Sequence, residues 1–271
     1  MKQDAEKLFT EIFFRTTKRF SEIITFRWFN NQALPHVKDL IVKEHNEFVH
    51  DLSHGSEYAE FFTDRNGFFD KIGGADSLVE SMVREQVETY QSSIDASSLV
   101  LAHSAIDASA FDYLRVIGFI APIDQLENFV IKKTITLEEL KEKTQDEILK
   151  DKINKFIIGL ERESLLSKID KLFQICKPPA KFSPIKKYTY DRHRLVKLDE
   201  LRHEIVHGEG LKSPMIDCEN EIIYMKNTAN LLMALLNHAY GLKLNPYHIV
   251  FDKMNNSNKA NAADAKSRAA D

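Results

Sequence analysis

One hexapeptide, Arg202 to His207, gathers most of the residue types in this sequence that could do chemistry together. It reads Arg-His-Glu-Ile-Val-His and is followed by Gly208. Two histidines four residues apart lie on the same face of a helix, one turn from each other. The arginine adds a planar fork of donors suited to phosphate or carboxylate oxygens. The pattern is compatible with two kinds of site.

The first kind is a zinc site. His203-Glu204-Ile-Val-His207 fits the H-E-x-x-H pattern, in which the histidines hold the metal and the glutamate activates a bound water. The extended form of that pattern has a third histidine where this chain has Ser213, so Glu219 or Glu221 would have to replace it. The sequence also lacks a convincing strand that could present a substrate along a sheet edge. We therefore rank a zinc-dependent hydrolase third among the functions considered, and we expect neither a metal nor a cofactor.

The second kind of site depends on where Arg202 lies. The hexapeptide ends a predicted helix that begins near residue 190 and stops at Gly208, because glycine suits a left-handed cap. At about 100° per residue, Arg202 falls inside an apolar arc of this helix, whereas His203 and His207 point to the opposite side. The arc is formed by Leu195, Leu198, Leu201, Ile205 and Val206. Since a guanidinium keeps its charge, Arg202 should contact a carboxylate such as Asp107, a subunit interface or an anionic ligand.

Read from Arg202, the segment resembles the HEPN family (higher eukaryotes and prokaryotes nucleotide-binding), whose motif is Arg-x4-His. The resemblance is carried by Leu201-Arg-His-Glu-Ile-Val-His-Gly208. Residues 99–114 look like the first helix of that family, and an apolar helix after Asn220 looks like its last. The resemblance covers residues 90 to 245 and leaves residues 1–75 outside it.

The resemblance implies a metal-independent endoribonuclease that acts as a toxin or a phage-defence effector. Arg202 would hold the phosphate, and His207 would move a proton during attack by the RNA 2′-hydroxyl. His203 would occupy the polar position that often follows the motif arginine. Such proteins often form homodimers in which two motifs face one cleft, and they often have a cognate antitoxin or regulatory protein. Because some HEPN domains bind without cutting, a non-catalytic module that binds RNA, a nucleotide or a protein partner is the second function considered.

A basic window lies directly before the hexapeptide. Between residues 177 and 197 there are seven Lys or Arg residues and a single acid, Asp191. On charge alone, a solvated surface is an equal alternative to an anion-binding role. The position of the window leads us to predict RNA-binding roles for Lys181, Lys186, Lys187, Arg192 and Arg194. The residues predicted to line the same cleft are His103, Asp107 and Glu204.

The elements that position these residues should all be helices. Only nine glycines and seven prolines interrupt the chain, and Leu, Lys, Glu and Ala are used heavily. We predict an all-α fold with a HEPN-like helical bundle at residues 76–250. An N-terminal helical section at 1–75 would extend it, and a polar tail at 251–271 would be disordered.

Helix boundaries follow from apolar periodicity and capping patterns. The N-terminal section should hold one helix at 5–29 and a second at 37–52, separated near Pro35. A capping-box pattern at Ser77 should start a long helix that ends before Pro122 and either kinks or restarts at the serine-rich segment 92–98. A second capping pattern at Thr136 should open a stretch that runs to Cys176 and packs against residues 99–118. The last helix should cover residues 220–242.

Charge, cysteine usage and hydropathy limit the partners and the cellular compartment that the sequence predicts. The formal net charge of −4 does not attract nucleic acid globally, so RNA binding requires a local patch. Cys176 and Cys218 should be reduced, buried thiols. No segment approaches the roughly 18 uninterrupted apolar residues of a membrane span, so we expect a cytoplasmic protein without membrane contact.

Overall fold

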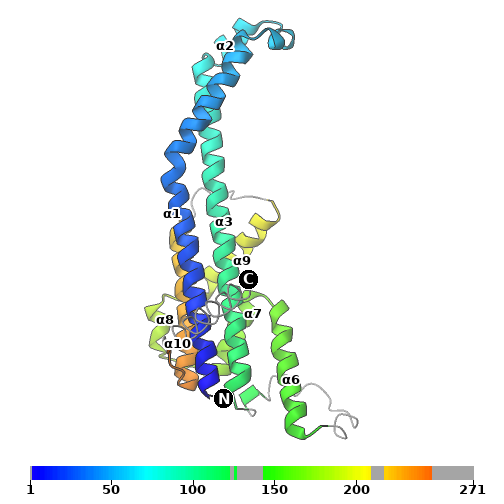
Figure 1. Cartoon of the computed structure of the whole chain (residues 1–271), viewed down its shortest axis with the longest axis vertical. Coiled ribbons are helices and arrows are strands. Elements are labelled where there is room, and N and C mark those ends of the chain that lie inside the picture. The colour runs from blue at the N-terminus through cyan, green and yellow to red at the C-terminus, as the bar shows by residue number, and fades with distance from the viewer. Residues whose placement is uncertain (1, 123–124, 127–142, 209–216, 246–271) are drawn as a thin grey trace, which may run out of the picture. The chain divides into compact units, whose positions relative to one another are not determined.

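The computed structural model describes residues 2–122, 125–126, 143–208 and 217–245 (Figure 1). Within these ranges the chain forms eight α-helices and no strand, which confirms the all-α prediction. None of the described helices is long and apolar enough to cross a membrane. The helices are α1 (Lys2–His54), α2 (Arg65–Lys71), α3 (Ala75–Ile120), α6 (Gln145–Gly159), α7 (Leu165–Cys176), α8 (Ser183–Lys187), α9 (Arg192–Val206) and α10 (Cys218–Tyr240).

The chain divides into two compact units. Unit 1 comprises Met1–Phe20, Ala102–Asp199 and Ile223–Asp271, and unit 2 comprises Ser21–Leu101 and Glu200–Ile222. Helices α1, α3, α9 and α10 contribute residues to both units. Each unit therefore combines segments from both sides of residue 75, where the sequence had suggested a domain boundary.

In unit 1, the first turns of α1 pack against the second half of α3. The rings of Phe9 and Tyr113 lie 6.0 Å apart, and the hydroxyl groups of Thr16 and Ser109 share a hydrogen bond of 2.8 Å. Helices α7 and α10 bury an apolar face in the same unit, including Ile169, Leu172, Leu231, Leu232 and Leu235. Burial of this apolar surface is the main source of stability for the unit.

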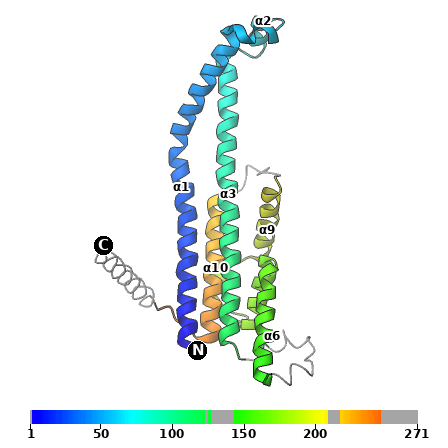
Figure 2. The same ribbon diagram turned by 45° about the vertical axis from the view of Figure 1, so that its right-hand side comes forward.

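In unit 2, α1 and α3 run side by side in opposite directions (Figures 1 and 2). Their shared core contains Ile41, Val49, Val79 and Val83. Polar contacts flank this core: Arg27 Nε donates to Asp95 Oδ1 at 2.8 Å, and the Tyr90 hydroxyl donates to Asn30 Oδ1 at 3.0 Å. The paired helices thus form a hairpin closed by α2 and the turns around it.

Helix α1 is continuous, and the predicted break between residues 29 and 37 is wrong. Pro35 lies inside the helix. A proline removes one backbone hydrogen bond and crowds the preceding turn. The turns on either side of it are anchored to α3, through Asn30 and through the buried Ile41. These contacts hold the helix through the proline.

Helix α3 is also continuous, so the restart considered at 92–98 is wrong, and the helix begins two residues before the predicted start at Ser77. Ser93 Oγ donates to the carbonyl of Thr89 at 2.8 Å, which satisfies the serine inside the helix. The helix begins at Ala75 because Gly73 and Gly74 make the preceding turn with φ of 84° and 99°.

The remaining boundaries agree in part with the predictions. Helix α10 matches the expected helix at 220–242 to within two residues at each end. Helix α6 begins with a capping box formed by Thr144 and Glu147. The start predicted at Thr136 and the tail predicted at 251–271 lie outside the described residues.

Candidate functional site at the end of helix α9

The hexapeptide forms the last turn of α9 and the residue after it. The helix ends at Val206, and the backbone N–H of His207 donates to the carbonyl of His203 at 3.0 Å. Gly208 follows with φ of 82°, a left-handed conformation that favours glycine. The predicted helix stop at Gly208 is confirmed.

His203 and His207 are neighbours on the exposed surface of unit 2. Their ring centroids lie 4.2 Å apart, with an angle of 52° between the planes. Both side chains are exposed, as is Glu204 between them. An imidazole can accept a proton in its neutral form and donate one when charged, so this pair can transfer protons to or from a bound molecule.

Arg202 is half-buried, and its Nε atom is buried without a hydrogen-bond partner among the described residues. Within the same described part of the chain, Arg202 also makes no ion pair. A buried donor on a permanently charged group normally has an acceptor. The guanidinium is therefore suited to an anion that the described residues do not supply.

The apolar arc around Arg202 is only partly buried. Leu195 and Leu198 are buried, whereas Val206 is 50% exposed. Val206 is the last residue of the helix, which leaves it at the exposed end of the arc.

Asp107 and His103 of unit 1 have partners of their own. Asp107 accepts two hydrogen bonds from Lys168 Nζ, at 2.8 and 2.9 Å. His103 is buried, and its Nε2 lies 2.9 Å from Asp199 Oδ1, an ion pair when the histidine is protonated. The partner of Asp107 is therefore Lys168 and not Arg202. The role of both residues in lining a cleft remains a prediction.

The five basic residues assigned to RNA binding all belong to unit 1. Lys181, Lys186, Lys187 and Arg192 are exposed. Three of the five have partners within the unit. Arg192 makes a forked contact with Asp170, at 3.2 and 2.8 Å, Arg194 lies over the Tyr224 ring at 4.4 Å, and Lys187 Nζ lies 5.2 Å from the centroid of the Tyr188 ring. The hydrogen bond and charge of Asp170 raise the pKa of Arg192. The lysines, for which no ion pair is found among the described residues, are therefore more available for phosphate than Arg192.

The described residues provide no group of three or more His, Cys, Asp or Glu side chains that could hold a metal ion. Glu219, considered above as a third zinc ligand, instead accepts a hydrogen bond from Arg27 Nη1 at 3.3 Å. Ser213 lies outside the described residues.

Both cysteines are free and buried, which confirms the prediction of reduced thiols. Burial raises the pKa of Cys176 and of Cys218 to about 12. Neither thiol is therefore a nucleophile near neutral pH, because the thiolate is the reactive form.

Sequence reasoning missed Lys168, whose side chain is almost fully buried. The signal was its place in the apolar face of α7, between Leu165 and Leu172. A lysine in such a stripe indicates a carboxylate partner, which here is Asp107.

A search of family models, curated proteins and solved structures finds no match to this chain in any of the three.

Proposed function

We propose that this chain is a metal-independent endoribonuclease of the HEPN type, in which Arg202 binds the scissile phosphate and His207 transfers a proton. The proposal rests on one observation at the end of α9. There, a half-buried guanidinium whose Nε has no hydrogen-bond partner among the described residues lies in the same six residues as two exposed imidazoles with ring centroids 4.2 Å apart. A phosphate oxygen is the kind of acceptor that would satisfy the arginine.

In the proposed reaction, the RNA 2′-oxygen attacks the adjacent phosphorus. The O2′–P bond forms and the P–O5′ bond breaks, which leaves a cyclic phosphate and a free 5′-hydroxyl. His207 takes the proton of the 2′-hydroxyl, and His203 beside it is suited to protonate the departing O5′. Arg202 offsets the negative charge on the phosphoryl oxygens.

The proposal includes a homodimer in which the α9 ends of two chains face one RNA strand. A half-buried guanidinium whose Nε has no partner among the described residues is explained if a second chain and its RNA complete the surroundings. The biological role that follows is that of a toxin or phage-defence effector, held in check by an antitoxin or another regulatory protein.

The test is cleavage of a labelled single-stranded RNA by the full-length protein in buffer that contains a chelator. Wild-type protein should cut, whereas Arg202→Ala and His207→Ala should each cut about 10²- to 10⁴-fold more slowly while remaining folded. Glu204→Gln is the matched control, because Glu204 is exposed in the same turn but has no role in this reaction. It should cut like the wild type.

Two results would overturn the proposal. Loss of activity both on chelation and in Glu204→Gln would indicate the zinc hydrolase. An absence of cleavage by the wild type would indicate a non-catalytic module.

One observation favours that second candidate, a module that binds a protein partner. Trp28 and Phe29, consecutive residues of α1 in unit 2, are 60% and 65% exposed. Large apolar side chains exposed next to each other mark protein interaction sites.

A further inference from the structure

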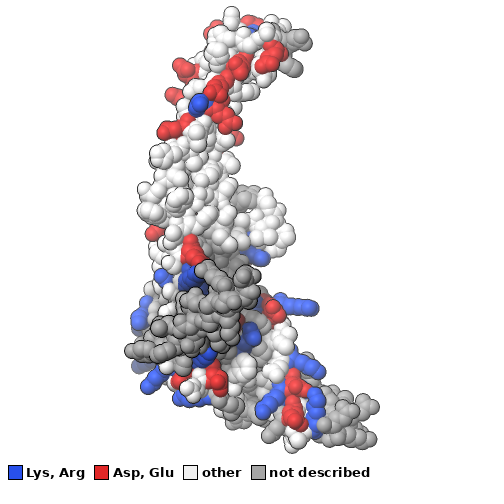
Figure 3. Space-filling view, viewed as in Figure 1, with Lys and Arg blue, Asp and Glu red and all other residues white. Residues whose placement is uncertain are grey.

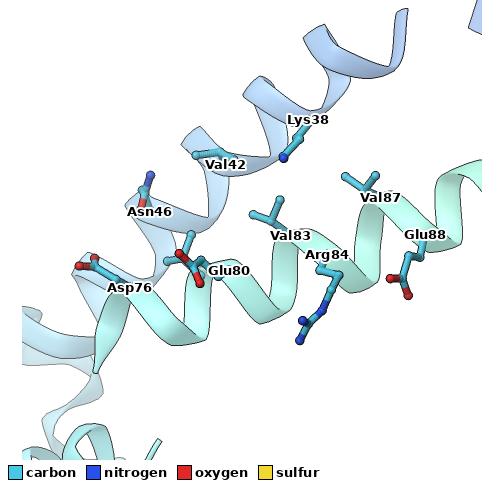
Figure 4. A pocket seen from close by; sticks show the side chains of 10 residues that line it. Lys38, Val42, Asn46, Asp76, Glu80, Val83, Arg84, Val87 and Glu88 are labelled. Atoms are coloured by element: carbon cyan, nitrogen blue, oxygen red, sulfur yellow. The ribbon is translucent and has the colours of Figure 1, made fainter. Parts of the chain in front are cut away.

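A groove between α1 and α3 in unit 2 contains none of the residues assigned to the proposed reaction (Figure 4). Its volume is about 610 Å³. Val42, Val79, Val83 and Val87 form an apolar floor, and charged side chains stand along its edges. Val79 and Val83 also belong to the core of the hairpin, whereas Val42 and Val87 are half-buried and open to the groove.

The first turn of α10 shows how a third helix lies against this pair of helices. Glu219 pairs with Arg27 of α1, and Cys218 Sγ donates to the backbone carbonyl of Asp95 on α3 at 3.5 Å. This turn and Ile24, Trp28 and Asn31 of α1 line a smaller pocket.

The groove lies on the same faces of both helices as these contacts. On α1, Lys38, Val42 and Asn46 follow Asn31 at steps of seven, four and four residues, which keeps them on one side of the helix. On α3, Glu88, Arg84 and Glu80 follow from Asp95 at the same steps in the reverse direction. Only α1 and α3 line this part of the groove among the described residues.

The length of the groove suits a short helix. From Lys38 to Asn46, α1 advances about 12 Å, and from Asp76 to Glu88, α3 advances about 18 Å. Two to three helical turns would cover the valines, since one turn rises about 5.4 Å.

The charges around the groove indicate which kind of helix would bind there. Residues 21–101 contain six Lys or Arg residues and fourteen Asp or Glu residues. Acidic side chains gather on the end of unit 2 that carries α2 (Figure 3). At the groove itself, three acids (Asp76, Glu80, Glu88) outnumber two bases (Lys38, Arg84). A second copy of this hairpin would bring the same negative excess and be repelled, whereas a basic helix would be attracted.

We propose that this groove binds an amphipathic helix of a partner protein, with an apolar stripe on the valines and Lys or Arg residues on its flanks. The inference does not depend on the ribonuclease proposal. Such a site lets a basic partner recruit or regulate the protein without occupying the end of α9.

The first experiment uses synthetic helical peptides of about three heptads and fluorescence polarisation with the full-length protein. One peptide carries leucines at the a and d positions and lysines on the flanks. A second replaces the lysines by glutamates, and a third scrambles the first. The lysine peptide should bind, with affinity that falls as salt rises, and the other two should bind about tenfold or more weakly.

The second experiment compares two pairs of variants. Val42→Asn changes the groove floor, and Leu40→Asn changes a residue that is 68% exposed and outside the groove. Glu80→Lys with Glu88→Lys reverses two groove acids, and Glu47→Lys with Asp51→Lys makes the same charge change at exposed sites elsewhere. The groove variants should weaken binding about tenfold, and the controls should change it by less than about twofold.

Equal effects of the groove and control variants, or tight binding of the scrambled peptide, would overturn the proposal. So would a homodimer, detected by sedimentation, that Val42→Asn dissociates and Leu40→Asn does not, because a second copy would then fill the groove. If Val42→Asn fails to fold, the charge-reversal pair still decides, because Glu80 and Glu88 are exposed.

Discussion

The Nζ atom of Lys168 lies 2.8 Å from one carboxylate oxygen of Asp107 and 2.9 Å from the other. The lysine side chain is 2% exposed, and that of Asp107 is 35% exposed. The pair joins α7 to α3 within unit 1. Since only the lysine is deeply buried, the two partners should respond differently to substitution.

Asp107→Ala should destabilise the protein by about 3 kcal/mol, because it leaves the buried ammonium group of Lys168 unpaired. Lys168→Met should cost less, since methionine fills the apolar site and the remaining carboxylate can be hydrated. Urea unfolding of the two variants measures the difference. Equal losses would contradict this account of the pair.

The helical class and the end of α9 were predictable because they depend on local signals. Apolar periodicity indicated the helices, and Gly208 marked a left-handed stop that the structure contains. The continuity of α1 was not predictable in this way. The destabilising effect of Pro35 on a helix can be predicted from the sequence. The contacts that offset it cannot, because they lie on α3, far away in the sequence.

The candidate site was predictable to the same extent. Arg202, His203 and His207 follow one another on one helix, so their local arrangement could be deduced from spacing. The partners of Asp107 and His103 could not, since Lys168 and Asp199 come from distant segments. The groove with the valine floor could not be predicted either, because it exists only where α1 and α3 pair.

The free energy of unfolding should fall as the pH rises above about 9. Burial raises the pKa of Cys176 and Cys218 from 9.0 to about 12, so the folded state retains these protons where the unfolded chain releases them. The unfolded state then binds fewer protons, and stability decreases with pH by at most about 1.4 kcal/mol per unit for each thiol. Burial also raises the pKa of Tyr113, which acts in the same direction.

Urea unfolding from about pH 8 to pH 11 tests this dependence. The double variant Cys176→Ala with Cys218→Ala should show a shallower fall than the wild type. At pH 8, both thiols should react with a thiol reagent only after unfolding. Rapid modification of the native protein would contradict the prediction.

Lys186→Ala with Lys187→Ala should weaken RNA binding and make it less dependent on salt. The slope of the log binding constant against the log salt concentration should become shallower by about two. The control is Lys150→Ala with Lys155→Ala, which removes the same charge from exposed positions of α6. Binding is measured between about 50 and 200 mM salt. An equal change of slope in both double variants would show a general charge effect and no contact at α8.

Gly208→Ala should reduce RNA cleavage more than its effect on stability explains. At φ of 82° an alanine is strained, and among the described residues no atom outside the neighbouring backbone lies within 4 Å of the position that its Cβ would take. The cost to the free energy of unfolding should therefore be about 1 kcal/mol from the backbone alone. To relieve that strain the turn after Val206 must change, and His207 lies in that turn.

Gly74→Ala is the matched control, because Gly74 has φ of 99°, an equally open Cβ position and no link to α9. Both variants should lose similar stability in urea, but only Gly208→Ala should cut RNA slowly. If the two variants cleave RNA equally well, the position of His207 at the end of α9 does not matter for the reaction.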